Sequence, residues 1–316
     1  MTTPQNTPSA SRNDARNKTL RIATRKSDLA LWQARWVRDR LGELGHDAEL
    51  VLIETQGDRD LQAFHLMQGQ GFFTKAVQDA VIADEADVAV HSHKDLPSAL
   101  MPQLEVAAIS GRADPRDVLI VRPEALDADA TSLPVGAGAV IGTSAARRQS
   151  QLRSLRPDLD VRELRGNVPT RVQKLRDGAY DAVVLAAAGL ERLGLDLGGL
   201  EPHFLAPDVM VPAPAQGVLA LECRRDDFEV ASLLTDLHDA TTYKAIAAER
   251  GLMSMLQGGC QLALGAHAVL KDGTIELSAY YEGQRVTVSH PSSEGAAMLA
   301  YDALGRPAPT LRGELP

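Results

Sequence analysis

Hydrophobic positions change their spacing repeatedly along the first hundred residues, and each change marks a new element. Short apolar runs predict buried strands at 20–24, 50–53 and 87–90. Apolar residues at helical spacing predict two helices between them, one from a Ser27 cap to Gly45 and one over 73–83. This alternation of strand and helix predicts a mostly parallel sheet with helices on both faces.

The rest of the chain repeats this alternation and then departs from it. Further strands are predicted at 118–121, 140–143, 160–164 and 182–186, with helices between them, and Pro169 suits the first turn of a helix ending at Arg176. A proline-rich crossing at 210–217 leads to a strand at 218–223 and to helices at 226–237 and 243–256. An Asp272-Gly273 turn predicts a hairpin, followed by a helix at 294–304. We expect an α/β protein with two similar α/β units and a smaller α+β unit.

Composition excludes several classes of protein. The chain has 316 residues, of which 44% are hydrophobic, enough for two or three domains. It has no stretch of about 18 apolar residues, so no membrane span is expected. Residues 1–18 are polar and basic, which predicts a disordered tail and not a secretory signal. Cys223 and Cys260 are too few for a disulfide framework or a zinc site, and we expect a location in the reducing cytosol.

Charge is distributed unevenly along the chain. The net charge of −9 argues against general affinity for nucleic acid. Between residues 147 and 176, however, three acidic residues oppose nine basic ones, namely Arg147, Arg148, Arg153, Arg156, Arg162, Arg165, Arg171, Lys174 and Arg176. Such a concentration of cations in an acidic protein predicts a site for a specific anion. A solvated helix face is the alternative, which charge alone leaves open.

Polar residues follow several predicted strands at their carboxyl ends, where ligands bind in parallel α/β sheets. In the first unit these residues are Arg25, Ser27, His91, Ser92, His93, Lys94 and Asp95. In the second unit they are Thr143, Ser144, Arg147, Arg148, Arg165, Gly166 and Arg171. Hydroxyls and free N–H groups at helix starts bind anions, and paired guanidinium groups grip carboxylates or phosphates. The pattern predicts a cleft between the two units for a ligand with several negative charges.

Asp95 is a carboxylate in a cationic neighbourhood. Lys94 and the arginines would favour its ionised form, whereas burial would act the other way. An ionised carboxylate there could stabilise a developing cation or move protons. A helix cap or an ion-pair partner of Lys94 is the alternative, which spacing does not exclude. His91 and His93 have no evident third ligand near them, so no metal site is predicted.

Cys260 follows two glycines just beyond a predicted helix. Glycines there permit an unusual backbone conformation and keep bulk away from the sulfur, which favours a thiol that a large group can reach. The alternative is a small buried hydrophobic residue, the role expected of Cys223 in its apolar strand. No Cys-His-Asn arrangement of a protease is evident.

An ordered series of motifs runs from Leu20 to Ala268. The motifs are RIATRKS at 21–27, VHSHKDLP at 90–97, DPRD at 114–117, GTSAARRQ at 142–149, LRGNVPTR at 164–171, AGLERLG at 188–194, PAQG at 214–217, and ER at 249–250 with GGCQ at 258–261. In this series the chain resembles the porphobilinogen deaminase, or hydroxymethylbilane synthase, family. Residues after 268 match the family only loosely, and those before 19 do not match it.

The resemblance implies a transferase that joins four porphobilinogen molecules head to tail, releases ammonia at each step and frees hydroxymethylbilane. It implies a dipyrromethane cofactor held by a thioether at Cys260. It also implies a cytoplasmic monomer whose partner is its small-molecule substrate, without nucleic acid or membrane. The implied fold has two α/β domains resembling periplasmic binding proteins, which flank a cleft, and a small C-terminal α+β domain. We expect their bounds at 19–112 with 216–238, at 113–215 and at 239–316, after the disordered tail at 1–18.

The resemblance also assigns roles to residues. Asp95 is similar to the family's catalytic carboxylate, which stabilises the azafulvenium cation left when ammonia departs and helps to move protons. Cofactor and substrate carboxylates are expected on Arg25, Ser27, Lys94, Thr143, Ser144, Arg147, Arg148, Arg165, Gly166, Arg171, Arg192 and Gln216, with His91, Ser92 and Phe73 in support. Three features depart from the family pattern: Ala145 replaces a usual serine, Pro169 replaces a common glycine, and the loop Leu66–Gln70 lacks lysines.

Three other functions share parts of this pattern. A solute-binding protein for an anion would have the same two-lobed architecture, but such proteins usually carry a signal peptide or lipid anchor and do not need Cys260. A cytosolic anion sensor would not need a catalytic carboxylate. A cysteine-dependent acyltransferase would need a base beside Cys260, and the sequence does not identify one. The ordered motifs favour the deaminase.

Overall fold

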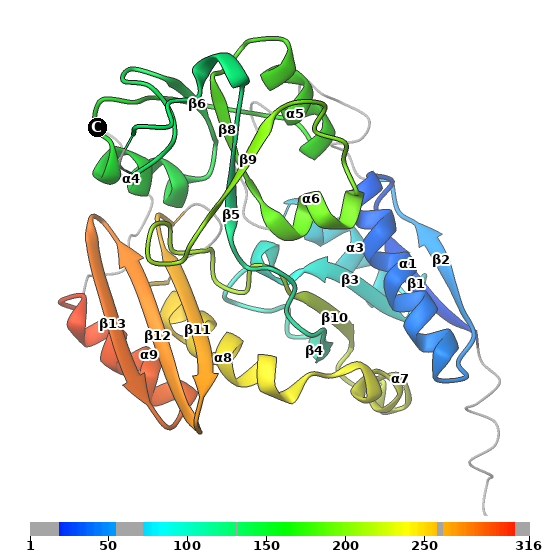
Figure 1. The fold of residues 1–316 in the computed structure, drawn as a ribbon. Helices are drawn as coiled ribbons and strands as arrows, with labels where there is room; N and C mark the ends of the chain where they lie inside the picture. The colour runs from blue at the N-terminus through cyan, green and yellow to red at the C-terminus, as the bar shows by residue number, and fades with distance from the viewer. Residues whose placement is uncertain (1–18, 55–71, 131, 258–261, 307–316) are drawn as a thin grey trace, which may run out of the picture.

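The computed structural model describes residues 19–54, 72–130, 132–257 and 262–306. Within these residues the chain forms two five-stranded sheets and one three-stranded sheet, each with its own helices (Figure 1). The predicted α/β architecture with a smaller α+β unit is therefore confirmed. The tail at 1–18, the loop Leu66–Gln70 and Cys260 lie outside the described residues. No helix in the described part of the chain is long and apolar enough to cross a membrane.

The first sheet combines N-terminal strands with one that returns much later in the sequence. Its strands, in spatial order, are β2 (Ala48–Leu52), β1 (Leu20–Thr24), β3 (Val88–Ser92), β10 (Leu219–Arg224) and β4 (Leu104–Ile109). β1 pairs in parallel with β2 and β3, and β10 pairs antiparallel with β3 and β4. Four of these strands therefore run in one direction and β10 runs against them, so the sheet is mostly parallel, as the sequence predicts.

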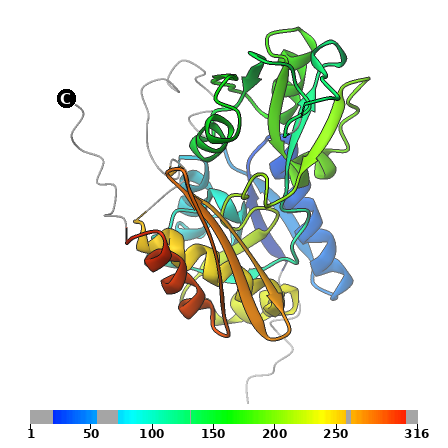
Figure 2. The ribbon, with the colours of Figure 1, turned by 60° about the vertical axis from the view of Figure 1, so that its left-hand side comes forward.

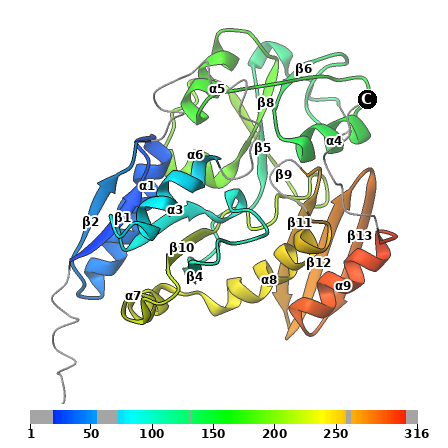
Figure 3. The ribbon, with the colours of Figure 1, turned by 180° about the vertical axis from the view of Figure 1, so that it is seen from behind.

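Helices cover both faces of the first sheet. They are α1 (Asp28–Glu43), α3 (Phe72–Ile82) and α7 (Phe228–Leu234), which is followed by a 3-10 turn at Thr235–Leu237. Leu20 and Ile22 pack in the core with α1 and α7, whereas Ala23 packs in a separate core with α3 on the opposite face (Figure 3). Alternate residues of β1 thus enter different cores, because successive side chains of a strand point to opposite faces. Ser27 caps α1 as predicted and accepts a hydrogen bond from the Ala30 N–H at 3.4 Å.

The second sheet repeats the plan of the first. Its strands, in spatial order, are β7 (Asp160–Arg162), β6 (Val140–Gly142), β8 (Ala182–Ala186), β5 (Asp117–Val121) and β9 (Glu201–Leu205). β6 pairs in parallel with β7 and β8, and β5 pairs antiparallel with β8 and β9. One core lies under α4 (Ala146–Leu155) and the other under α5 (Val168–Arg176) and α6 (Ala187–Leu193). A 3-10 turn at Pro123–Ala125 follows β5.

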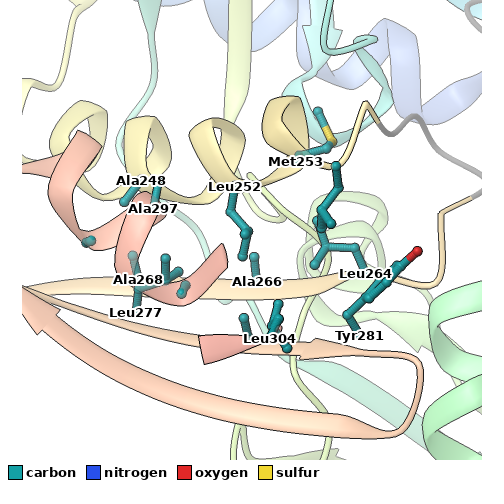
Figure 4. Packing of buried hydrophobic residues seen from close by; sticks show 14 of the residues in the cluster. Ala248, Leu252, Met253, Leu264, Ala266, Ala268, Leu277, Tyr281, Ala297 and Leu304 are labelled. Atoms are coloured by element: carbon teal, nitrogen blue, oxygen red, sulfur yellow. The ribbon is translucent and has the colours of Figure 1, made fainter. Parts of the chain in front are cut away.

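The third sheet is antiparallel and smaller. Its strands are β11 (Gly265–Lys271), β12 (Thr274–Tyr281) and β13 (Gln284–His290), accompanied by α8 (Ala240–Met255) and α9 (Ser293–Ala303). Figure 2 shows both helices on one side of this sheet. Leu252 of α8 and Ala297 of α9 pack with Ala266 and Leu277 of the strands (Figure 4). The hairpin predicted at Asp272-Gly273 is confirmed as the turn between β11 and β12.

The end of β3 differs from the sequence prediction. We predicted that this strand stops at Val90, before a run of polar residues, but it continues to Ser92. The reason is β10, because Ala220 and Leu219 of that strand pair with His91 and Ser92. A 3-10 turn at His93–Asp95 follows and changes the direction of the chain.

Candidate active site

A cavity of about 1020 Å³ opens between the first two sheets. Residues that follow β1 and β3 line one side, and residues that follow β6, β7 and β8 line the other. The cavity therefore lies at the carboxyl ends of parallel strands, where the sequence predicted it. The predicted residues that line it are Arg25, Ser27, Ser92, Lys94, Asp95, Ser144, Arg148, Arg165, Gly166, Arg171, Arg192 and Gln216.

Other predicted residues have different positions. The cavity, as the described residues form it, leaves out Thr143, Arg147 and His91, all of which are buried. The Nε2 atom of His91 lies 3.0 Å from the carboxylate of Glu222, on the neighbouring strand. Phe73 belongs to α3, but its side chain lies outside the described part of the structure, as does Cys260.

Asp95 ends the 3-10 turn with its side chain exposed to the cavity. This turn is held from the third unit, because Arg250 of α8 donates hydrogen bonds to its backbone. The acceptors are the carbonyl oxygens of His93, Leu96 and Pro97, at 3.4, 3.3 and 2.6 Å. The position of Asp95 thus depends on α8 as well as on β3.

Six basic side chains and three acidic ones line the cavity, so its field favours anions. Burial and the nearby charge of Arg148 lower the pKa of Arg171, and the charge of Asp95 opposes this effect. Arg171 belongs to the second unit and Asp95 to the first. The two charges therefore act on each other across the cavity.

Lys94 connects the Asp95 turn to the segment that returns from the second sheet. Its Nζ atom donates a hydrogen bond to Gln216 Oε1 at 3.2 Å. Burial lowers the pKa of Lys94 to about 8, although the charge of Asp95 raises it. A fraction of Lys94 side chains is consequently neutral in mildly alkaline solution.

Asp117 is the buried partner of both neighbouring arginines of α4. Arg147 Nη1 donates to Asp117 Oδ2 at 2.6 Å, and Arg148 Nη2 donates to Oδ1 at 2.8 Å. Gln216 Nε2 donates to the same Oδ1 at 2.9 Å. Burial opposes ionisation of Asp117, but the two guanidinium charges outweigh it and hold the pKa of this carboxyl well below its usual range. Arg148 therefore reaches the cavity with its orientation fixed by Asp117.

We expect Asp117→Ala to lower the free energy of unfolding by about 3–5 kcal/mol, because it leaves two buried guanidinium groups without their carboxylate. Asp114→Ala is the matched control, since Asp114 pairs with Arg116 in a partly exposed position and should cost at most about 1 kcal/mol. Urea unfolding at neutral pH measures both losses. Equal losses in the two variants would contradict this account. The depressed pKa means that the Asp117 contribution is lost only as the pH falls below about 4.

Arg192 joins α6 to the first unit. Its Nη2 atom donates to the carbonyl of Gly217 at 2.8 Å, and its guanidinium lies 5.6 Å from the ring centre of Trp32 in α1. Burial lowers its pKa to about 10. In Figure 1 α6 lies beside α1, so this contact ties the two sides of the cavity together at one end.

Three polar residues of the lining, Asp28, Glu163 and Asn167, were not among the predicted site residues. Asn167 caps α5 by accepting a hydrogen bond from the Thr170 N–H at 2.9 Å. The sequence signal that could have identified Glu163 and Asp28 is their place after the end of a strand. Glu163 follows β7, and Asp28 begins the helix after β1.

Two family models match the chain along most of its length. The model described as "Porphobilinogen deaminase, dipyromethane cofactor binding domain" matches residues 20–232. The chain belongs to the porphobilinogen deaminase family. A second model, "Porphobilinogen deaminase, C-terminal domain", matches residues 243–281.

Relatives named porphobilinogen deaminase match most of the chain. The protein of Syntrophobacter fumaroxidans is 45% identical over 265 residues, which cover 83% of this chain and 84% of that protein. That of Corynebacterium efficiens is 45% identical over 290 residues, or 91% of each chain. That of Roseiflexus sp. is 47% identical over 258 residues, covering 80% of this chain and 82% of the relative. The protein is thus an enzyme of the transferase class that acts on porphobilinogen with a dipyrromethane cofactor.

Similar solved structures are more distant. The periplasmic VFT2 domain of BvgS from Bordetella pertussis has 18% identity and a TM-score of 0.43, with 71% of this chain and 87% of that chain covered. A putative periplasmic sulfonate-binding protein, SsuA from Methylobacillus flagellatus KT, has 14% identity and a TM-score of 0.40, with 75% and 68% covered.

The cavity suits the carboxylate-rich cofactor of a porphobilinogen deaminase. Each pyrrole carries an acetate and a propionate, and carboxylates pair with guanidinium and ammonium groups. Arg148 and Lys94 present such groups at positions fixed by Asp117 and Gln216. Ala145, the N-cap of α4, has no side-chain hydroxyl and makes no side-chain cap hydrogen bond, and Pro169 lies in the first turn of α5.

We expect the KM for porphobilinogen to rise as the pH passes about 8, because Lys94 loses its proton there and no longer attracts carboxylates. Lys94→Gln should have a higher KM at neutral pH and should lack this rise. Steady-state kinetics across neutral and alkaline pH measure both. Titration of the substrate itself would affect the two proteins equally, so an identical pH profile in the variant would exclude this role of Lys94.

Proposed function

We propose that the cavity between the two five-stranded sheets is where four porphobilinogen molecules condense head to tail, with loss of ammonia at each step, to give hydroxymethylbilane. The position of Asp95 carries this proposal. It is an exposed carboxylate at the carboxyl end of β3, in a cavity lined by six basic side chains. A purely anion-binding protein would gain nothing from a carboxylate there, because it repels the ligand.

Basic side chains on both sides of the cavity bind the acetate and propionate groups. Arg25 and Lys94 do so from the first unit, and Arg148, Arg165 and Arg171 do so from the second. Guanidinium groups suit this task because their fixed forks hold carboxylates in one orientation. The reacting ring is thereby oriented relative to Asp95.

Asp95 performs the proton chemistry in this proposal. Its negative charge stabilises the cation that develops on the substrate as ammonia leaves. The free ring carbon of the terminal pyrrole attacks this cation, and after the new carbon–carbon bond forms, Asp95 accepts the proton that leaves the attacking ring carbon and passes it to water. The same carboxylate serves each cycle, so the growing chain moves past it or the domains shift.

Cys260 is the proposed attachment point of the dipyrromethane through a thioether. When bound, this cofactor supplies the terminal ring to which the first substrate is added. Cys260 follows α8 closely in the sequence, and Arg250 of α8 holds the backbone of the Asp95 turn. This link supports attachment near Asp95. Cys223, by contrast, is fully buried in β10, and burial raises the pKa of its thiol to about 12.

The proposal extends to domain bounds and setting. The three sheets support domains at 19–112 with 216–238, at 113–215 and at 239–316. A cytoplasmic location is consistent with Cys260, because thioether formation needs a reduced thiol. We propose a monomer that has small-molecule partners only, with neither nucleic acid nor membrane among them.

The test is the stoichiometry of the reaction catalysed by the purified protein. The proposal predicts that four porphobilinogen molecules disappear, and four ammonia molecules appear, for each hydroxymethylbilane formed. Ammonia and tetrapyrrole are measured in the same samples. Binding of porphobilinogen without ammonia release would instead support a two-lobed binding protein, the alternative that family membership does not favour.

A further inference from the structure

The loop that follows β7 presents a carboxylate and a guanidinium to the cavity from a rigid backbone. Four consecutive carbonyl oxygens accept hydrogen bonds from side chains. They are Glu163 O from Tyr180 Oη at 2.6 Å, Leu164 O from Ser144 Oγ at 2.7 Å, Arg165 O from Lys174 Nζ at 3.0 Å, and Gly166 O from Arg171 Nε at 2.7 Å. Glu163 and Arg165 therefore project from fixed positions.

Arg165 is paired with Glu163 inside the cavity. Its Nε and Nη2 atoms donate to Glu163 Oε2 at 3.2 and 3.0 Å. The Nε–Nη2 edge of a guanidinium is also one that binds a ligand carboxylate through two hydrogen bonds. Glu163 consequently occupies donors that an acetate or propionate would use.

This ion pair can separate easily. The Arg165 and Glu163 side chains are 51% and 64% exposed, and such pairs contribute little because water and salt screen them. Asp117, the partner of Arg148, differs from Glu163 because its side chain is completely buried. Arg165 can therefore exchange its carboxylate, whereas Arg148 keeps the same one.

We propose that Glu163 competes with the carboxylates of the substrate for Arg165. Glu163 pairs with the Arg165 guanidinium until a carboxylate of the substrate or growing chain displaces it. The inference rests on the proposed function of the cavity and adds a residue that sets substrate affinity. Each ligand carboxylate that reaches Arg165 must break the internal pair first. Arg165 therefore holds the chain less tightly than an unpaired arginine would, which eases the movement of the chain between cycles.

Glu163→Gln tests this directly in the holoenzyme. The KM for porphobilinogen should fall roughly two- to fivefold, the range expected from loss of an exposed ion pair. Asp160→Asn is the matched control, because Asp160 and Arg162 form an exposed pair with the same sequence spacing but do not belong to the cavity lining described here. Its KM should equal that of the wild type. An unchanged KM in Glu163→Gln would overturn the proposal.

Combining Glu163→Gln with Arg165→Gln distinguishes competition for Arg165 from direct repulsion between Glu163 and the anionic substrate. In the Arg165→Gln protein, Glu163→Gln should have no further effect on the KM. If the decrease persists, Glu163 acts on the substrate by repulsion alone and the proposal fails. The proposal also fails if Arg165→Gln by itself leaves the KM unchanged. In that case, turnover by the wild type would still support the proposed function of the cavity.

A binding measurement provides a readout other than activity. In the Asp95→Ala protein, in which turnover is expected to be blocked, calorimetry should give a dissociation constant for porphobilinogen. Adding Glu163→Gln to this protein should lower that constant by the same roughly two- to fivefold factor. Adding Asp160→Asn should leave it unchanged. Equal constants in all three proteins would contradict the competitor role.

Discussion

Asp95→Ala is expected to lower kcat at least about a hundredfold, because one positioned acid or base typically contributes that much to a proton-transfer step. The substitution also removes the negative charge that stabilises the developing cation. The KM should change little or fall, since the carboxylates bind to the basic side chains and Asp95 opposes them. Initial rates of ammonia release at saturating porphobilinogen measure the effect.

Two further variants sharpen this prediction. Asp95→Glu keeps the charge but moves it by one methylene group, so it should retain more activity than Asp95→Ala and less than the wild type. Asp28→Asn removes another carboxylate from the cavity lining and should leave kcat close to the wild-type value. A similar loss in Asp28→Asn and Asp95→Ala would mean that the net charge of the cavity, and not the position of Asp95, controls the rate.

Cys260→Ser is expected to abolish turnover. A serine hydroxyl is a far weaker nucleophile than a thiolate at neutral pH, so it should not form the stable link to the dipyrromethane. Without an attached primer, the arginines can still bind porphobilinogen, but no terminal ring is held beside Asp95. The measurements are the rate of hydroxymethylbilane formation and the affinity for porphobilinogen in the same preparation.

Cys223→Ala is the control for the cysteine prediction. Cys223 lies in the apolar core of the first sheet, where a small hydrophobic side chain is tolerated. This variant should keep its activity and its cofactor. Full activity in Cys260→Ser, or its loss in Cys223→Ala without unfolding, would contradict the assignment of the two thiols.

Local rules predicted the elements whose pattern is complete within a short segment. Ser27 caps α1, Pro169 lies in the first turn of α5, and the Asp272-Gly273 turn joins two strands. The strands β4 and β9 were not predicted; β4 contains two alanines, which have low strand propensity, and β9 is mostly exposed and gives no apolar run. β13 was also missed, because its residues are exposed or only partly buried and give no apolar run.

The sequence predicted which strand ends meet at the cavity. It could not distinguish which of two neighbouring residues lines the cavity. Arg147 and Arg148 are adjacent and chemically identical, yet only Arg148 lines the cavity. Both donate to Asp117, which is distant in the sequence, but Arg147 also donates to the carbonyl of Val211 and Arg148 to that of Val184. The pairs Asp160–Arg162 and Glu163–Arg165 have the same spacing, and only the fold shows which one lines the cavity.

The intact mass of the denatured protein tests the central claim most directly. The account predicts that the wild type exceeds its sequence mass by one dipyrromethane, and that limited additions of porphobilinogen raise the mass in steps of one ring. Cys260→Ser should show its sequence mass under both conditions. An unmodified wild type that gains no mass after incubation with porphobilinogen, or the same excess mass in Cys260→Ser, would contradict covalent priming at this cysteine.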